Sequence, residues 1–165
     1  MTKTLLALLM SLAFIGCSSG DSSTPAKPKL ALNNSLSGLT LNDQFDKPHT
    51  LPKDTKTVIF AFSKEMGHLC NDFFVTQDAS YLADNNAVFI ADVSSAPSII
   101  RSMFIMPGLK DFEHTVLILD DSTTAAGFKA GVNTEKVIVV SLENATITKI
   151  DKAFSVNELK ALIKK

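Results

Sequence analysis

The chain has 165 residues, lacks tryptophan, and contains a single tyrosine and only two cysteines. It also lacks an excess of charge, since 16 Lys and Arg residues stand against 17 Asp and Glu residues, for a net charge of −1. No basic excess points to nucleic acid as a partner, and no acidic run points to a disordered tail. The remaining composition, 45% hydrophobic with eleven phenylalanines, is that of a globular domain long enough to bury a core.

The N-terminus has the pattern of an export signal. Lys3 precedes Leu5–Ile15, a largely apolar segment that is too short to span a bilayer and fits a cleavable signal peptide. Gly16 and Cys17 follow directly, and a small residue before cysteine at this place resembles the lipobox of bacterial lipoproteins. The two residues before Gly16 are bulkier than the usual lipobox residues. An ordinary signal peptide cleaved elsewhere is the alternative.

The lipobox resemblance implies that residues 1–16 are removed and that Cys17 carries fatty acyl chains, which attach the protein stably to the bilayer. Residues 17–36 are then the lipidated cysteine and a flexible tether, because Ser18–Ser35 is rich in Ser, Pro, Gly, Lys and Asn. The predicted location is the cell envelope, facing the periplasm. Ser18, in place of an Asp that would favour the inner membrane, favours the outer membrane.

Apolar runs and turn residues predict alternating strands and helices in residues 37–165. The expected elements are a hairpin of Leu39–Leu41 and His49–Leu51, a buried strand Val58–Phe62, a polar loop Ser63–His68, a helix Leu69–Tyr81, a buried strand Ala87–Asp92, a helix from Ser95 to Pro107, a strand Thr115–Leu119, a short helix Thr123–Ala130, a hairpin of Lys136–Leu142 and Thr146–Ile150, and a last helix opened by a capping box at Ser155 and Glu158. This order predicts an α/β fold with a mixed central sheet and helices on both faces.

Cys70 is the candidate reactive residue. The predicted strand, loop and helix place it outside the carboxyl end of a central strand, where α/β proteins build their sites. A nearby helix N-terminus would also favour its thiolate. With Cys17 acylated, Cys70 has no cysteine partner within the chain. In an oxidising compartment, such a thiol is either buried and inert or exposed and reactive.

The order of elements, with these residues, resembles the redoxin branch of the thioredoxin superfamily, which includes thioredoxin-like reductases and peroxiredoxins. The resemblance covers about Gly38 to Lys165 and rests on four segments: Lys56–Asn71, Leu41–Leu51, Leu117–Val132, and Val137–Ile150 followed by Ser155–Ile163. It implies a thioredoxin-like three-layer sandwich that begins with a β-hairpin.

The resemblance does not extend to dithiol chemistry. Thioredoxin-type reductases need a Cys-x-x-Cys pair after the central strand, because one thiolate attacks and the other resolves. Here the corresponding residues, Lys64–His68, contain no cysteine. Lys136 also stands where these enzymes place a cis-proline. A dithiol oxidoreductase is therefore excluded.

The peroxiredoxin motif Pro-x-x-x-Thr-x-x-Cys aligns without gaps on Ser63, Gly67 and Cys70. This alignment implies catalytic roles for Cys70 and Lys136, the latter near the position of the family's arginine, and substrate contacts for Ser63, Gly67 and His68. A cation close to Cys70 would lower its pKa. However, Gly67 lacks the threonine hydroxyl that orients peroxide.

Two non-catalytic readings stand beside this one. Cys70 can be a small core residue, with His68 and Lys136 as solvated side chains. Alternatively, Met66, His68 and Cys70 offer the sulfur and imidazole ligands that suit copper. Copper chaperones of the Sco type share the fold but have Cys-x-x-x-Cys, whereas this chain has Met66-x-x-x-Cys70. Met103 and Met106 are expected on the core face of their helix.

These observations favour a membrane-anchored accessory domain that binds an envelope protein without catalysis and without a metal or other cofactor. The alternative is a one-cysteine thiol peroxidase that depends on an external thiol reductant. The two hypotheses predict different surroundings for Cys70. They differ in whether its sulfur is exposed and in how far the sulfur lies from Lys136 and His68.

The anchor has a direct test. Cells that produce the chain and are fed a labelled fatty-acid analogue should incorporate the label into the protein, because acyl chains are expected on Cys17. Cys17→Ala should lose the label completely. Label retained in that variant would contradict the lipobox interpretation.

Overall fold

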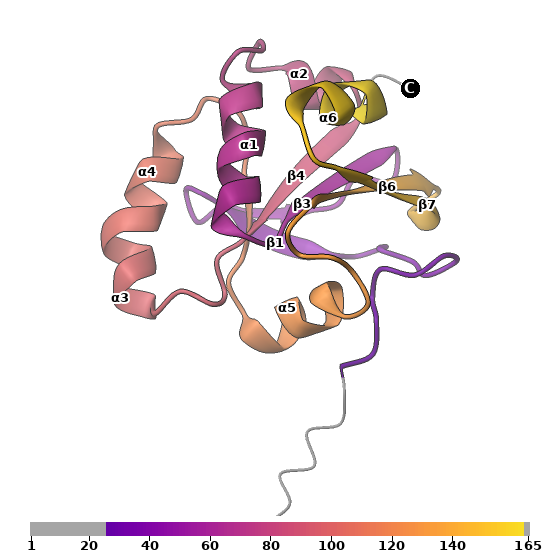
Figure 1. Cartoon of the computed structure of the whole chain (residues 1–165), viewed down its shortest axis with the longest axis horizontal. Coiled ribbons are helices and arrows are strands. Elements are labelled where there is room, and N and C mark those ends of the chain that lie inside the picture. The colour runs from indigo at the N-terminus through magenta and orange to yellow at the C-terminus, as the bar shows by residue number, and fades with distance from the viewer. Residues whose placement is uncertain (1–25, 164–165) are drawn as a thin grey trace, which may run out of the picture.

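The computed structural model describes residues 26–163 as a seven-stranded sheet with helices on both of its faces (Figure 1). In chain order the elements are β1 (Thr40–Asp43), β2 (Pro48–Thr50), β3 (Thr57–Ala61), α1 (Lys64–Phe74), α2 (Tyr81–Asp84), β4 (Ala87–Asp92), α3 (Ser98–Ile100), the π-helical turn η1 (Arg101–Ile105), α4 (Met106–Lys110), β5 (Leu117–Leu119), α5 (Ser122–Lys129), β6 (Val137–Glu143), β7 (Thr146–Ala153) and α6 (Val156–Ile163). No helix within residues 26–163 is long and apolar enough to cross a bilayer.

The sheet is mixed, in the order β2-β1-β5-β4-β3-β6-β7. Strands β3, β4 and β5 are parallel, while β1 pairs antiparallel with β5 and β6 pairs antiparallel with β3. All five residues of β3 are buried, as expected for a central strand covered on both faces. The α/β class, the N-terminal hairpin and the C-terminal hairpin are thereby confirmed.

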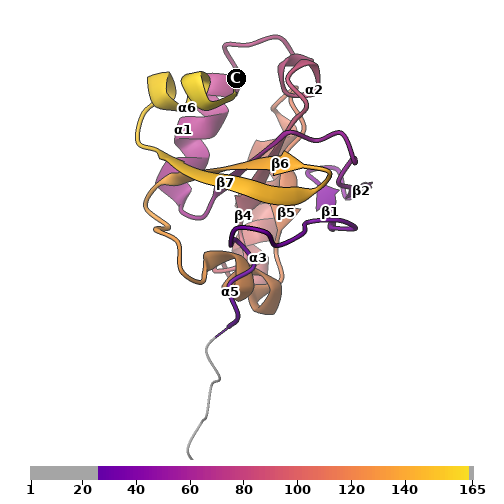
Figure 2. The same cartoon turned by 90° about the vertical axis from the view of Figure 1, so that its right-hand side faces the viewer.

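The two faces of the sheet carry separate hydrophobic cores, because alternate side chains of each strand point to opposite sides. Ile59 and Ala61 face a core that includes α1 and α6, together with Leu109 of α4. Val58 and Phe60 face the other core, which includes α5 and the N-terminal segment. Figure 2 shows α1 and α6 together on one side of the sheet, away from α5.

The N-terminal segment belongs to the folded domain earlier than residue 37. Leu30 and Leu36 are buried in the core beneath α5. The Lys29 N–H donates to the Gly127 carbonyl at 2.8 Å, and the Leu36 N–H donates to the Ala145 carbonyl at 2.8 Å. The prediction of a flexible tether was therefore wrong for residues 29–35. Residues 1–25, with Cys17 and the predicted signal peptide, lie outside the described part of the chain.

The first long helix begins five residues before the predicted start at Leu69. Ser63 has extended backbone geometry and its side chain accepts a hydrogen bond from the Met66 N–H at 3.4 Å, so it caps the helix. The predicted polar loop over Ser63–His68 is therefore the N-cap and the first five residues of α1. The helix ends at Phe74, and Tyr81 lies in the separate helix α2.

The second long helical segment continues through Pro107 instead of stopping there. Helices α3, η1 and α4 follow one another from Ser98 to Lys110 without a break. Pro107 occupies the first turn of α4, where its missing N–H costs least, directly after the π-helical turn. Met103, predicted in the core, is 61% exposed, whereas Met106 packs partly buried against the core.

A pair of leucines tests whether the N-terminal segment is part of the fold. Leu30→Ala should lower the free energy of unfolding by about 2–3 kcal/mol, because it removes buried apolar contacts. Leu32 is 59% exposed, and Leu32→Ala should change stability by no more than about 0.5 kcal/mol. Urea unfolding of both variants measures the difference. Equal, small effects would show that this segment does not pack as described.

Candidate functional site

Cys70 is a core residue. It is the seventh residue of α1, is 0% exposed and belongs to the hydrophobic core that contains Phe73 and Phe89. Because α1 begins at Lys64, Cys70 does not lie at a helix N-terminus as predicted. Burial raises the pKa of the Cys70 thiol well above its usual range. The thiol is therefore neutral and closed to solvent in the folded state.

The structure does not bring the two predicted polar partners to Cys70. Lys136 precedes β6, and its Nζ lies 3.6 Å from the centroid of the Phe154 ring, which is a cation–π contact. His68 is exposed on α1. Within residues 26–163 no hydrogen bond or ion pair joins Cys70 to Lys136 or His68, and burial is the cause of its raised pKa.

Two of the three predicted substrate contacts, Ser63 and Gly67, have structural explanations. Ser63 caps α1, and the Gly67 N–H donates to the Ser63 carbonyl at 2.9 Å in the first turn. A Cβ added at Gly67 would meet nothing within 4 Å, so close packing does not demand glycine there.

The copper alternative fails on helix geometry. Met66, His68 and Cys70 are spaced two residues apart on α1, and residues two apart on a helix do not share a face. His68 is exposed, whereas Cys70 is buried on the opposite side. Within residues 26–163 there is no group of three His, Cys, Asp or Glu side chains arranged to hold a metal ion.

An ion pair occupies the carboxyl edge of β4. The buried Asp92 carboxylate lies 2.9 Å from Lys129 Nζ at the end of α5, and its other oxygen accepts the Ser94 N–H at 2.8 Å. One carboxylate oxygen is thus hydrogen-bonded, while the other has no hydrogen-bond partner within residues 26–163 and is compensated only by the nearby Lys129 charge, which ties β4 to α5. Sequence reasoning missed this pair, although an Asp that ends an apolar strand was a signal for it.

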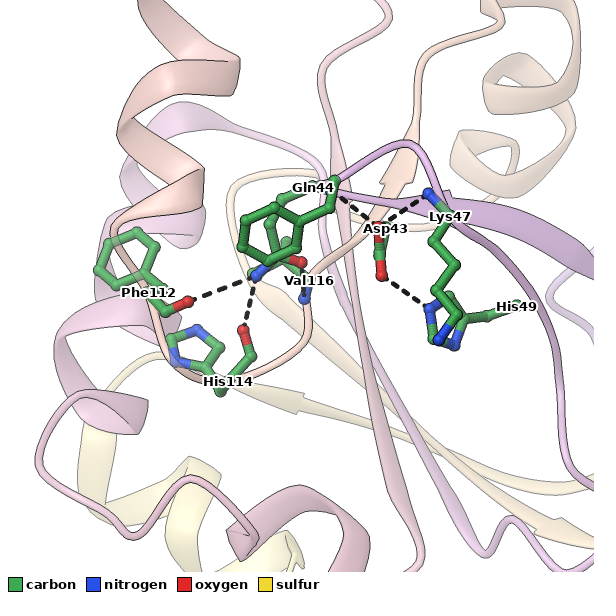
Figure 3. A network of polar contacts seen from close by, with 8 residues as sticks. Asp43, Gln44, Lys47, His49, Phe112, His114 and Val116 are labelled. Carbon is green, nitrogen blue, oxygen red and sulfur yellow. Dashed lines mark hydrogen bonds and ion pairs between the residues drawn. The ribbon is translucent and has the colours of Figure 1, made fainter.

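A buried polar network joins the first hairpin to the approach of β5 (Figure 3). The Gln44 side chain accepts the Val116 N–H at 2.9 Å and donates to the His114 carbonyl at 2.9 Å. The Gln44 side-chain amide thus makes the backbone hydrogen bonds that a neighbouring strand would make just beyond the end of β1. Before Gln44, Asp43 accepts the Lys47 N–H at 3.0 Å and contacts His49 Nε2 at 2.7 Å, which stabilises the turn.

His114 links this network to α1. Its Nε2 lies 3.0 Å from the Asn71 side-chain oxygen, and its ring packs among Phe74 and Phe112. Burial lowers the pKa of His114 to about 4. The ring is therefore neutral at pH 7, and its Nε2–H donates a hydrogen bond to the amide oxygen of Asn71. This arrangement is structural, since the histidine is closed to solvent and its polar atom is already paired.

A hollow of about 460 Å³ lies between β1, the end of β5 and the helical segment α3–η1–α4. Arg101 and Met106 line it from the helix, and Asp120 and Asp121 line it beyond β5. The Arg101 guanidinium donates to the Asp120 carbonyl at 2.5 Å, which fixes η1 against the start of α5.

The opposite side of that helical segment is apolar and uncovered. We call Ile99, Ile100, Met103 and Phe104 the apolar helix face; they are 62%, 41%, 61% and 66% exposed. All four side chains are apolar. It is the densest group of exposed large hydrophobic side chains in residues 26–163.

Comparisons with known proteins identify the fold. No family model matches the chain, and no curated protein sequence matches it. Among solved structures, the exposed lipoprotein thioredoxin Etrx1 of Streptococcus pneumoniae has a TM-score of 0.52 at 12% identity, over 76% of this chain and 97% of that one.

A putative protein disulfide isomerase from Bacteroides thetaiotaomicron has a TM-score of 0.51 at 13% identity, over 85% of this chain and 95% of that one. A peroxiredoxin-like protein from Aquifex aeolicus has a TM-score of 0.51 at 7% identity, over 84% and 89%. The predicted thioredoxin-like α/β fold is therefore confirmed, and these similarities establish the fold alone.

The buried His114 should make stability depend on pH. The unfolded chain binds a proton at this histidine near pH 6.5, whereas the folded chain does not until about pH 4. As pH falls through this window the unfolded state gains protons, so the free energy of unfolding should drop by up to about 1.4 kcal/mol per pH unit. His114→Gln should flatten this slope, and His68→Gln, at an exposed position, should leave it unchanged. An unaltered slope in His114→Gln, measured by urea unfolding, would contradict the assignment.

Proposed function

We propose that this protein is a lipid-anchored envelope protein whose thioredoxin-like domain binds a partner and does not catalyse thiol chemistry. The observation that carries the proposal is the complete burial of Cys70 in the core. Thiol enzymes react through an accessible thiolate, and a buried thiol with a raised pKa supplies none.

The fold by itself does not argue for an enzyme, because function depends on sites placed on a fold. Residues 64–68 contain no cysteine pair, and acylation of Cys17 would leave Cys70 without a second thiol. The one-cysteine peroxidase reading relied on a helix N-terminus and a cation at Cys70. Neither feature lies beside the sulfur, so no observation favours that alternative.

The anchor and the location rest on the N-terminal sequence. The lipobox-like Gly16 and Cys17 support acylation and a place in the cell envelope, facing the periplasm. Ser18 favours the outer membrane over the inner one. Among the compared structures, one is described as an exposed lipoprotein thioredoxin of Streptococcus pneumoniae, which shows that this fold occurs on a lipid-anchored protein. The partners are then the bilayer, through Cys17, and an envelope protein.

Alkylation of the native protein tests the absence of thiol chemistry. In the mature protein with Cys17 acylated, Cys70 should resist a thiol-reactive reagent at pH 7 until the domain is unfolded, because its sulfur is closed to solvent. Hydrogen peroxide should likewise leave unchanged the mass of the peptide that carries Cys70, whereas exposed methionines such as Met103 can be oxidised. His68→Cys is a matched control, since it places a thiol two residues away on the exposed side of α1 and should be alkylated at once.

Rapid alkylation of Cys70 in the folded chain would contradict the proposal. So would a sulfenic acid at Cys70 that forms with peroxide and can be trapped. Either result would reinstate the one-cysteine peroxidase with an external reductant.

A further inference from the structure

We propose that the apolar helix face docks onto the surface of the same bilayer that holds the Cys17 anchor. The inference rests on the anchor in the proposed function and adds a specific orientation of the domain on the membrane. The apolar helix face would then be a second, reversible membrane contact, so that the domain lies against the bilayer.

The apolar helix face is strongly exposed to solvent. Three of the four side chains, Ile99, Met103 and Phe104, are more than 60% exposed. The π-helical turn η1 brings them together with Ile100 on one side of a continuous helical segment, while Arg101 and Met106 face the hollow on the other side. A helix with an uncovered apolar face and a polar opposite face is the kind of helix that binds in the plane of a membrane interface.

The helical segment that carries the apolar helix face starts at the end of the domain where the described chain also begins (Figures 1 and 2). Figures 1 and 2 both show α3 and α5 at the end of the domain where the described chain begins, with α6 at the opposite end. Arg101 contacts the start of α5 through the Asp120 carbonyl, and Lys29 is bonded to Gly127 near the end of α5. The helical segment that carries the apolar helix face is therefore joined, from its other side, through one short helix to the point where the chain enters the fold.

Only a short stretch of chain connects Cys17 to the folded domain. Lys29 follows Cys17 by twelve residues, which reach at most about 40 Å when fully extended. The eight residues of α5 span only about 12 Å. An acylated Cys17 therefore limits how far the apolar helix face can move from the bilayer. A tether of this length makes even weak docking effective, because it raises the local concentration of the face at the membrane.

Chemistry favours lipid over a protein as the occupant. Protein interfaces concentrate their binding energy in Trp, Tyr and Arg, and none of the four side chains of this face is of these types. The adjacent Arg101 is already engaged with the Asp120 carbonyl. Charge is balanced at this end of the domain, since the exposed Lys27 and Lys29 are offset by Asp120 and Asp121. Docking should therefore depend on apolar contact and persist at high salt.

The test uses the full, lipidated chain in vesicles of phosphatidylethanolamine and phosphatidylglycerol with brominated acyl chains. In a Cys70→Ala background, Met103→Cys carries an environment-sensitive fluorophore on the apolar helix face. Lys160→Cys, on the exposed side of α6 at the opposite end, carries the same label as a matched control. We expect a blue shift and loss of most emission to the brominated lipid at position 103, and neither change at position 160.

Two further variants separate apolar docking from general proximity. Ile99→Ser with Phe104→Ser should abolish the quenching at position 103. Leu32→Ser with Val75→Ser, which removes two equally exposed apolar side chains elsewhere, should leave it unchanged. All four positions are exposed, so these substitutions should leave the thermal unfolding of the domain close to that of the parent.

The outcomes distinguish docking from anchoring. If the chain floats with the vesicles but position 103 behaves like position 160, docking is overturned and the anchor stands. If the chain does not float, the anchor of the proposed function fails and the docking proposal falls with it. A blue shift without lipid quenching that grows with protein concentration would identify a second copy or another protein as the occupant and would also overturn the proposal.

Discussion

The hydrogen-bonded cap at Ser63 sets the direction of every side chain on α1. Because the Ser63 side chain satisfies the Met66 N–H, the helix begins at Lys64, directly after the central strand. From that start, the helical repeat turns Cys70, Phe73 and Phe74 toward the sheet and His68 toward solvent. A later start would have left Cys70 at the open N-terminus of a helix, where a thiolate is stabilised. The chemical character of this cysteine thus depends on where one helix starts.

The same helix is held at its far end by polar groups that are buried and paired. Asn71 contacts His114, and the carbonyl of His114 accepts from Gln44, so α1, the approach to β5 and the first hairpin form one connected unit. Buried polar groups of this kind destabilise a fold unless each finds a partner. Here the partners come from three separate segments, which explains why a neutral histidine is retained inside an aromatic core.

The sequence predicted the fold well where local pattern decides structure. The apolar run Ala87–Asp92 coincides with β4, and the closing hairpin and the capping box at Ser155 and Glu158 were found as expected, with Ser155 accepting the Glu158 N–H at 3.4 Å. It failed where neighbours distant in sequence decide. Lys64–His68 is polar because one side of α1 faces water, and this made a helix resemble a loop. Leu30 lies in a stretch of tether-like composition, yet it packs beneath α5.

The place of Cys70 in the order of elements was predictable, but its surroundings were not. The position of Cys70 after the central strand followed from the order of elements, whereas its burial depends on the register of α1 and on packing against residues such as Phe89. The pairs of Asp92 with Lys129 and of His114 with Asn71 join residues more than 35 positions apart, and no local pattern identifies which residue is the partner of Asp92 or of His114.

The central claim is that Cys70 has no accessible thiolate, and a titration of thiolate absorbance in the native full chain tests it most directly. With Cys17 acylated, Cys70 is the only thiol in the protein. An unperturbed cysteine ionises near about pH 8.5. The structure predicts that no thiolate signal appears through that range while the protein stays folded, since burial raises the pKa of Cys70. A thiolate that titrates at or below the ordinary value in the folded protein would contradict this account.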